Sequence, residues 1–157
     1  MRGNEKPVAA LTRIAPRYDL QIVLLPVGWC HRDLDTLRAV QEAGAGRFTL
    51  LEDVGSPVEV GAVIGACDCF VGSSLHANLT ALSFGVPHIV INNPLHAAKP
   101  EGYVQLAGLE DFRIIDLGNL QACFERLTST PREGWTAVGQ RLKGRVYEHF
   151  DRLADLI

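Results

Sequence analysis

The chain has 157 residues, of which 47% are hydrophobic and 21% charged, and its 15 basic and 18 acidic side chains give a net charge of −3. This length suits one globular domain with its own core, and the composition excludes disordered, collagen-like and coiled-coil proteins. The small acidic excess offers no general attraction to nucleic acid or to an anionic membrane, so any anion-binding site must be local.

No apolar run approaches the roughly 18 residues of a membrane-spanning helix, and no apolar stretch follows the charged N-terminus as in a secretory signal. We therefore expect a cytoplasmic protein without a membrane span. The four cysteines, at positions 30, 67, 69 and 123, form no C-x-x-C pair, which favours reduced, buried thiols over a disulfide or a metal site.

Short β-rich segments alternate with helix-length amphipathic ones, which predicts an α/β fold with a parallel sheet and helices on its faces. In the first half we expect a helix near 7–14, a strand at 19–26, a helix at 32–43, a strand at 48–51 and a helix to about residue 66. Ser56 should cap that last helix, because Pro57 suits its first position and Glu59 its first turn.

In the second half we expect strands at 69–72, 88–92 and 112–116 and helices at 74–84, 101–107 and 120–127. A long amphipathic helix should run from about Trp135 to Ile157 and pack back on the domain, because apolar residues recur there every three or four positions. Residues 1–157 would then form a single Rossmann-like, three-layer domain with about five parallel strands.

Several nucleotide and hydrolase motifs are absent. The turn after the first strand contains one glycine, Gly28, where a dinucleotide-binding G-x-G-x-x-G needs three, and no Gly-Lys-Ser/Thr occurs for a P-loop. A nucleophile elbow fails because His76 replaces its last glycine. We expect no cofactor.

The segment after the third strand is the most informative one for function. A helix that begins at Ser73 or Ser74 would direct the free amides of Ser74, Leu75 and His76 out of the carboxyl edge of the sheet, where open α/β sheets bind anions. His76 could donate to a phosphate or carboxylate, and a helix N-terminus favours its neutral form. Alternatively, Ser73 only caps the helix and His76 packs beside it.

Other polar residues should face the same edge. Asn92 and Asn93 end the fourth strand and could bind sugar hydroxyls, although Asn before Pro94 is also an ordinary turn. His31 follows the first strand, and Glu52 follows the second, where a carboxylate could bind a sugar hydroxyl. His88 and His149 should be structural.

The motifs then show a family pattern. An acid-bearing helix (Ser56-Pro57-x-Glu59) precedes Asp68-x-Phe70-Val71-Gly72-Ser73-Ser74-Leu75-His76, followed by Gly85-Val86-Pro87 and Lys99. This order, over roughly residues 19–117, resembles the carboxyl-terminal half of the polysaccharide pyruvyl transferase family. Ser74 departs from the pattern, which usually has Arg there, the natural bidentate partner of a carboxylate or phosphate.

The resemblance implies a fold of two facing Rossmann-like halves, similar to type B glycosyltransferases, of which this chain would be the second. It also implies transfer of pyruvate from phosphoenolpyruvate to sugar hydroxyls as a ketal, in exopolysaccharide or cell-wall glycan synthesis. His76 would be the donor or acid at phosphoenolpyruvate, and the helix amides with Lys99 would hold its anionic groups. With Ser74 in place of Arg, the charge would come from Lys99 or from the N-terminal half, so this chain alone would be an incomplete enzyme.

Two other functions fit the same features. A nucleotide-sugar-binding half of a type B glycosyltransferase or epimerase would use the same helix N-terminus and would bind uridine or guanosine nucleotides tightly. A non-catalytic glycan-binding module would bind sugars but no phosphoenolpyruvate.

Overall fold

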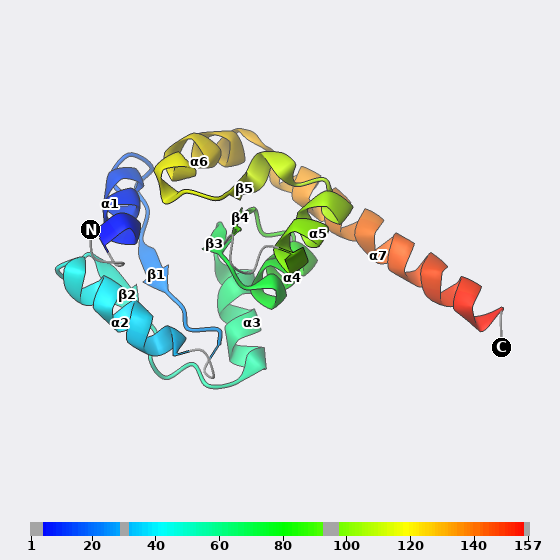
Figure 1. Cartoon of the computed structure of the whole chain (residues 1–157), viewed down its shortest axis with the longest axis horizontal. Helices are drawn as coiled ribbons and strands as arrows, with labels where there is room; N and C mark the ends of the chain where they lie inside the picture. The colour runs from blue at the N-terminus through cyan, green and yellow to red at the C-terminus, as the bar shows by residue number, and fades with distance from the viewer. Residues whose placement is uncertain (1–4, 29–31, 93–97, 156–157) are drawn as a thin grey trace.

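The computed structural model describes residues 5–28, 32–92 and 98–155 (Figure 1). Helices and short strands alternate along the chain, which confirms the predicted α/β class. In order, the elements are α1 (Glu5–Ile14), β1 (Ile22–Leu24), α2 (Asp33–Ala43), β2 (Phe48–Leu50), α3 (Pro57–Ala66), β3 (Phe70–Gly72), α4 (Leu75–Ser83), β4 (His88–Ile91), α5 (Ala98–Ala107), β5 (Arg113–Ile114), α6 (Leu120–Ser129) and α7 (Arg132–Ala154).

The strands form two small parallel sheets instead of the predicted single sheet of about five strands. β1 pairs with β2, and the second sheet has the order β3-β4-β5. Side chains separate the two: Leu25, Val27 and Phe70 pack against a buried cluster that includes Ile64 and Val86. In the described part of the chain, β1 and β3 are therefore joined by apolar packing and not by a hydrogen-bonded ladder.

The main core surrounds β4, the central strand of the larger sheet. Ile89 and Val90 on this strand are fully buried between helices. α4 supplies Leu82, α5 supplies Val104 and α6 supplies Phe124 to the same cluster. Burial on both faces explains why this strand is the longest and most apolar of its sheet.

The start of α3 confirms the predicted cap. The Ser56 hydroxyl accepts a hydrogen bond from the Glu59 amide at 3.2 Å, and the Glu59 carboxylate accepts one from the Ser56 amide at 2.9 Å. This reciprocal capping box satisfies two of the helix's free donors. The hydrogen bond from the Ser56 amide also lowers the pKa of the Glu59 carboxyl.

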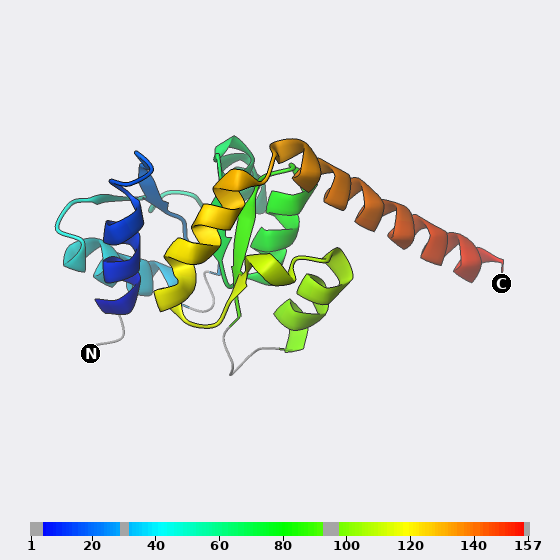
Figure 2. The same ribbon diagram turned by 90° about the horizontal axis from the view of Figure 1, so that it is seen from above.

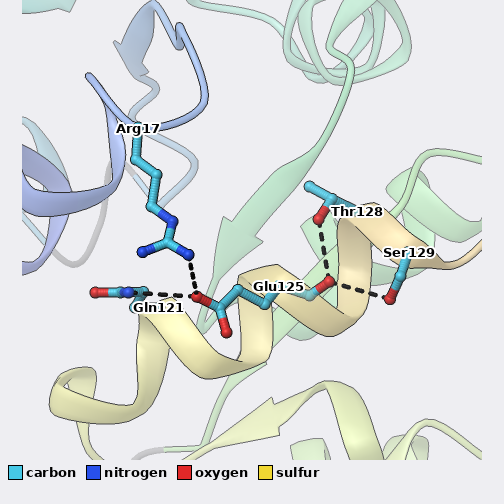
Figure 3. A network of polar contacts seen from close by, with 5 residues as sticks. All are labelled: Arg17, Gln121, Glu125, Thr128 and Ser129. Carbon is cyan, nitrogen blue, oxygen red and sulfur yellow. Dashed lines mark hydrogen bonds and ion pairs between the residues drawn. The ribbon is translucent and has the colours of Figure 1, made fainter.

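A polar network ties the segment after α1 to α6 (Figure 3). The Arg17 guanidinium lies 3.1 Å from the Glu125 carboxylate, and Gln121 donates to that carboxylate at 3.3 Å. Beside it, the Tyr18 and Phe124 rings lie 4.9 Å apart, centre to centre. Since the ion pair is half exposed, the aromatic contact stabilises this junction more than the charges do.

Helix α7 departs from the prediction in its second half. Trp135, Val138 and Leu142 pack on the core, as expected. Beyond them the helix projects away from the domain (Figures 1 and 2). Its apolar side chains there, among them Tyr147 and Phe150, are 41–60% exposed, so the prediction that the whole helix packs back is wrong.

The described cysteines are free thiols, as predicted. Cys123 is buried, and Cys67 and Cys69 are half-buried. Burial raises the pKa of Cys69 to about 11, which keeps this thiol protonated and unreactive at neutral pH.

Candidate functional site

The β3–α4 turn forms a helix N-terminus at the carboxyl edge of the larger sheet. Ser74 is the N-cap, and its hydroxyl accepts a hydrogen bond from the Ala77 amide at 3.4 Å. The helix therefore begins at Leu75, and its cap is Ser74, not Ser73. The amides of Leu75 and His76 have no acceptor within the helix, and the helix dipole makes this end attractive to anions.

Two residues hold this turn in shape. Gly72 lies directly under the Phe70 ring, where an added Cβ would come within 2.6 Å of the ring. Asn78 is fully buried, and its Nδ2 donates to the carbonyls of Gly72 at 3.1 Å and Ser74 at 2.8 Å. Sequence reasoning missed Asn78; the available signal was an amide side chain four residues after the cap, within an otherwise apolar helix.

His76 and Leu75 differ in their surroundings. The His76 side chain is exposed in the first turn of α4, whereas Leu75 is half-buried and packs against the main core. A ligand at this helix end can therefore reach the imidazole of His76 and the backbone of Leu75.

Asn92 lies at the same edge, beside this helix end. Gly72, the last residue of β3, pairs with Val90, two residues before Asn92, so the β3–α4 turn and Asn92 follow neighbouring strands at the same edge of the sheet. Asn92 is 3% exposed, and its Nδ2 donates to the Glu101 carboxylate at 2.8 Å. Because a carboxylate only accepts hydrogen bonds, this contact fixes the orientation of the amide.

The other amide atom of Asn92 is left without a partner. Its Oδ1 is buried and finds no hydrogen-bond donor among the described residues. A buried acceptor without a donor costs about 1–3 kcal/mol, so this atom is suited to accept from a ligand hydroxyl or from water.

Glu101 and Arg113 were not predicted as site residues, and the structure brings them to this edge. The Arg113 guanidinium forms an ion pair with the Glu101 carboxylate, and each side chain is 31% exposed. Gln105 donates to the other carboxylate oxygen at 3.2 Å. Glu101 was recognisable only as an acid near a helix start, and Arg113 only as the opening of a strand, since their pairing depends on the tertiary fold.

The remaining predicted residues come from other elements. Lys99 is exposed near the start of α5. Glu52 follows β2 of the other sheet, and Arg38 binds its carboxylate at 2.8 Å and lowers its pKa. This carboxylate already accepts hydrogen bonds from Arg38 and is 44% exposed, and its role at a sugar hydroxyl stays a prediction. His31 and Asn93 lie outside the described residues.

The model of the polysaccharide pyruvyl transferase family matches residues 4–94, more than half of the chain. The chain belongs to this family. The match contains the β3–α4 turn and Asn92, whereas Lys99, Glu101 and Arg113 follow it. Membership indicates polysaccharide pyruvyl transfer as the general activity, with sugars among the substrates. No solved structure matches the chain.

Among the described residues, no group of three or more His, Cys, Asp or Glu side chains is placed to hold a metal ion. Over the same residues, no helix combines the length and the apolar character that crossing a membrane requires.

Proposed function

We propose that this chain is the carboxyl-terminal, donor-binding half of a pyruvyl transferase, and that phosphoenolpyruvate binds at the N-terminus of α4. One observation carries the proposal: the exposed His76 and the free amides of Leu75 and His76 share one helix end at the carboxyl edge of a parallel sheet. This helix end also lies within the residues that match the family.

The proposed donor carries a carboxylate and a phosphate, both of which accept hydrogen bonds. The amides of Leu75 and His76 and the exposed Ser73 would donate to one of these groups, and Lys99 would supply a positive charge. His76 would donate to the other group or deliver the proton that turns the methylene carbon into a methyl group. One sugar hydroxyl then bonds to the central carbon and returns a proton to His76, and phosphate leaves with the electron pair of its C–O bond. A second hydroxyl bonds to the same carbon and gives its proton to the phosphate, which completes the ketal.

Ser74 bears on how much charge this half supplies. Ser74 carries no charge where the family pattern has Arg, and its hydroxyl is engaged as the helix cap. Arg113, the nearby cation, is paired with Glu101. We therefore propose that an N-terminal Rossmann-like half completes the site, so that this chain alone binds the donor weakly and does not turn it over.

The acceptor sugar is proposed to contact Asn92. Glu101 fixes the direction of the Asn92 Oδ1, which has no donor among the described residues, and Asn92 follows β4 at the edge where α4 begins, so a sugar hydroxyl that reaches this atom would donate to it.

Calorimetric titration of the chain with phosphoenolpyruvate tests the donor site. His76→Ala should weaken binding several-fold and leave the melting temperature nearly unchanged, because the side chain is exposed. His149→Ala, which removes an exposed histidine from α7, is the matched control and should bind as the parent does. Equal binding by all three proteins would refute the donor site, and tighter binding of a uridine or guanosine diphosphate would assign the helix end to a nucleotide sugar instead.

A further inference from the structure

The projecting half of α7 has an uncovered apolar face. Val146, Tyr147 and Phe150 are 46%, 59% and 60% exposed. With Leu79 and Phe84 of α4 they line a groove of about 640 Å³. The groove lies at the carboxyl end of α4, the opposite end from Ser74, so a partner seated there would leave the proposed donor site open.

Within the described part of the chain, this face of α7 stays uncovered. The first half of α7 is fixed by the buried Trp135. Arg141 then donates to the Ala107 carbonyl at 2.9 Å, and Arg145 to the Leu106 carbonyl at 3.4 Å, at the end of α5. These contacts set the direction of a continuous helix, so no other element of the described residues covers Phe150.

The charges on α7 indicate which partner would fit this face. Residues 140–146 carry three basic side chains and no acid; Arg141 and Arg145 bind α5, and Lys143 lines the groove. Residues 147–155 carry three acids and one base. The helix is therefore basic, then acidic, along its length. Two copies of it complement each other only when they run antiparallel.

We propose that two copies of this chain associate through antiparallel α7 helices, each covering the groove of the other. Lys143, Tyr147 and Asp151 are spaced four residues apart and therefore lie along one side of the helix. A two-fold axis near Tyr147 places Lys143 of one copy beside Asp151 of the other, at both ends of the pair. The apolar groove supplies the affinity, and the charges set the orientation.

Sedimentation velocity of the full chain over a dilution series tests this association. The parent should approach twice the monomer mass as its concentration rises, and Phe150→Asp should remain at the monomer mass. Ile115→Asp is the matched control, because Ile115 is 57% exposed but lies after β5, away from α7. This control should associate as the parent does.

A charge exchange tests the orientation independently. Lys143→Glu and Asp151→Lys should each weaken association, because each places like charges together, and the combined variant should regain it. Recovery of this kind requires that the two residues meet between copies. A parent that stays monomeric at every concentration, or a combined variant that associates no better than the single ones, would overturn the proposal.

Discussion

The Asn92 side chain donates a 2.8 Å hydrogen bond to Glu101, and this contact links the carboxyl end of β4 to the first turn of α5. Arg113 balances the charge of the same carboxylate from β5. Glu101 therefore joins β4, α5 and β5 at the proposed acceptor edge.

Glu101→Gln should lower the free energy of unfolding by about 1 kcal/mol, because Arg113 loses its charged partner in a site that is still partly solvated. Urea unfolding measures the change. Glu110→Gln, an exposed acid outside this network, is the control and should unfold as the parent does. Equal midpoints for both variants would show that the Glu101 network does not stabilise the fold.

His88 should make stability depend on pH. Its Nε2 lies 2.7 Å from the Tyr103 hydroxyl and its Nδ1 3.0 Å from the Val86 carbonyl, and burial lowers its pKa to about 4. Between pH 4 and 6.5 the unfolded chain therefore binds more protons than the folded one. Stability should be complete above pH 6.5 and fall by about 3 kcal/mol as the pH drops to about 4.

Denaturant unfolding at a series of pH values measures this dependence. His88→Gln, which does not titrate, should be less stable at neutral pH but should lose this part of the slope. An unchanged slope in that variant would assign the pH dependence to other groups.

Gly72→Ala should destabilise the β3–α4 turn by about 1–3 kcal/mol, because the new methyl group would displace the Phe70 ring. Gly102→Ala in α5 is the control of opposite sign. No atom lies within 4 Å of its added Cβ, so the better helix propensity of alanine should raise stability slightly. Thermal melts compare the two, and a stable Gly72→Ala protein would mean that the close approach of Phe70 is unimportant.

Much of the fold follows from local signals. The order of helices and strands, the capping box at Ser56 and the start of α4 near Ser74 depend on residues close in sequence. The division into two sheets does not follow from local signals, because it depends on how Phe70 packs against residues of other elements. The projection of α7 from the domain could not be predicted from the sequence either. An amphipathic stripe around Phe150 shows that one face of the helix is apolar, but not what packs against that face.

The candidate site also has one part that local sequence predicts and another that depends on tertiary contacts. Strand-to-helix succession predicts the helix end at Ser74, whereas the orientation of Asn92 requires Glu101 and Arg113, which come from two later elements. Glu52 was chosen by its place after a strand, and its pairing with Arg38 across 14 positions could not be seen from that place.

Ser74→Arg should separate two effects: loss of the α4 helix cap, which acts on stability, and gain of a positive charge, which acts on phosphoenolpyruvate binding. Because Ser74 caps α4 and does not lie within its first turn, the variant should lose about 1 kcal/mol of stability. It should nevertheless bind phosphoenolpyruvate more tightly, since a guanidinium is a charged bidentate partner. Ser56→Arg places the same charge at the start of α3 and is the matched control: it should lose stability without any gain in binding.

The most direct measurement is an amide NMR titration of the chain with phosphoenolpyruvate. The signals of Leu75, His76 and Ala77, at the start of α4, should shift in a saturable manner, while those of Val58 and Glu59, at the start of α3 with its capping box, should stay nearly in place. Equal shifts at the two helix ends, or none at α4, would contradict the assignment of this helix end as the donor site.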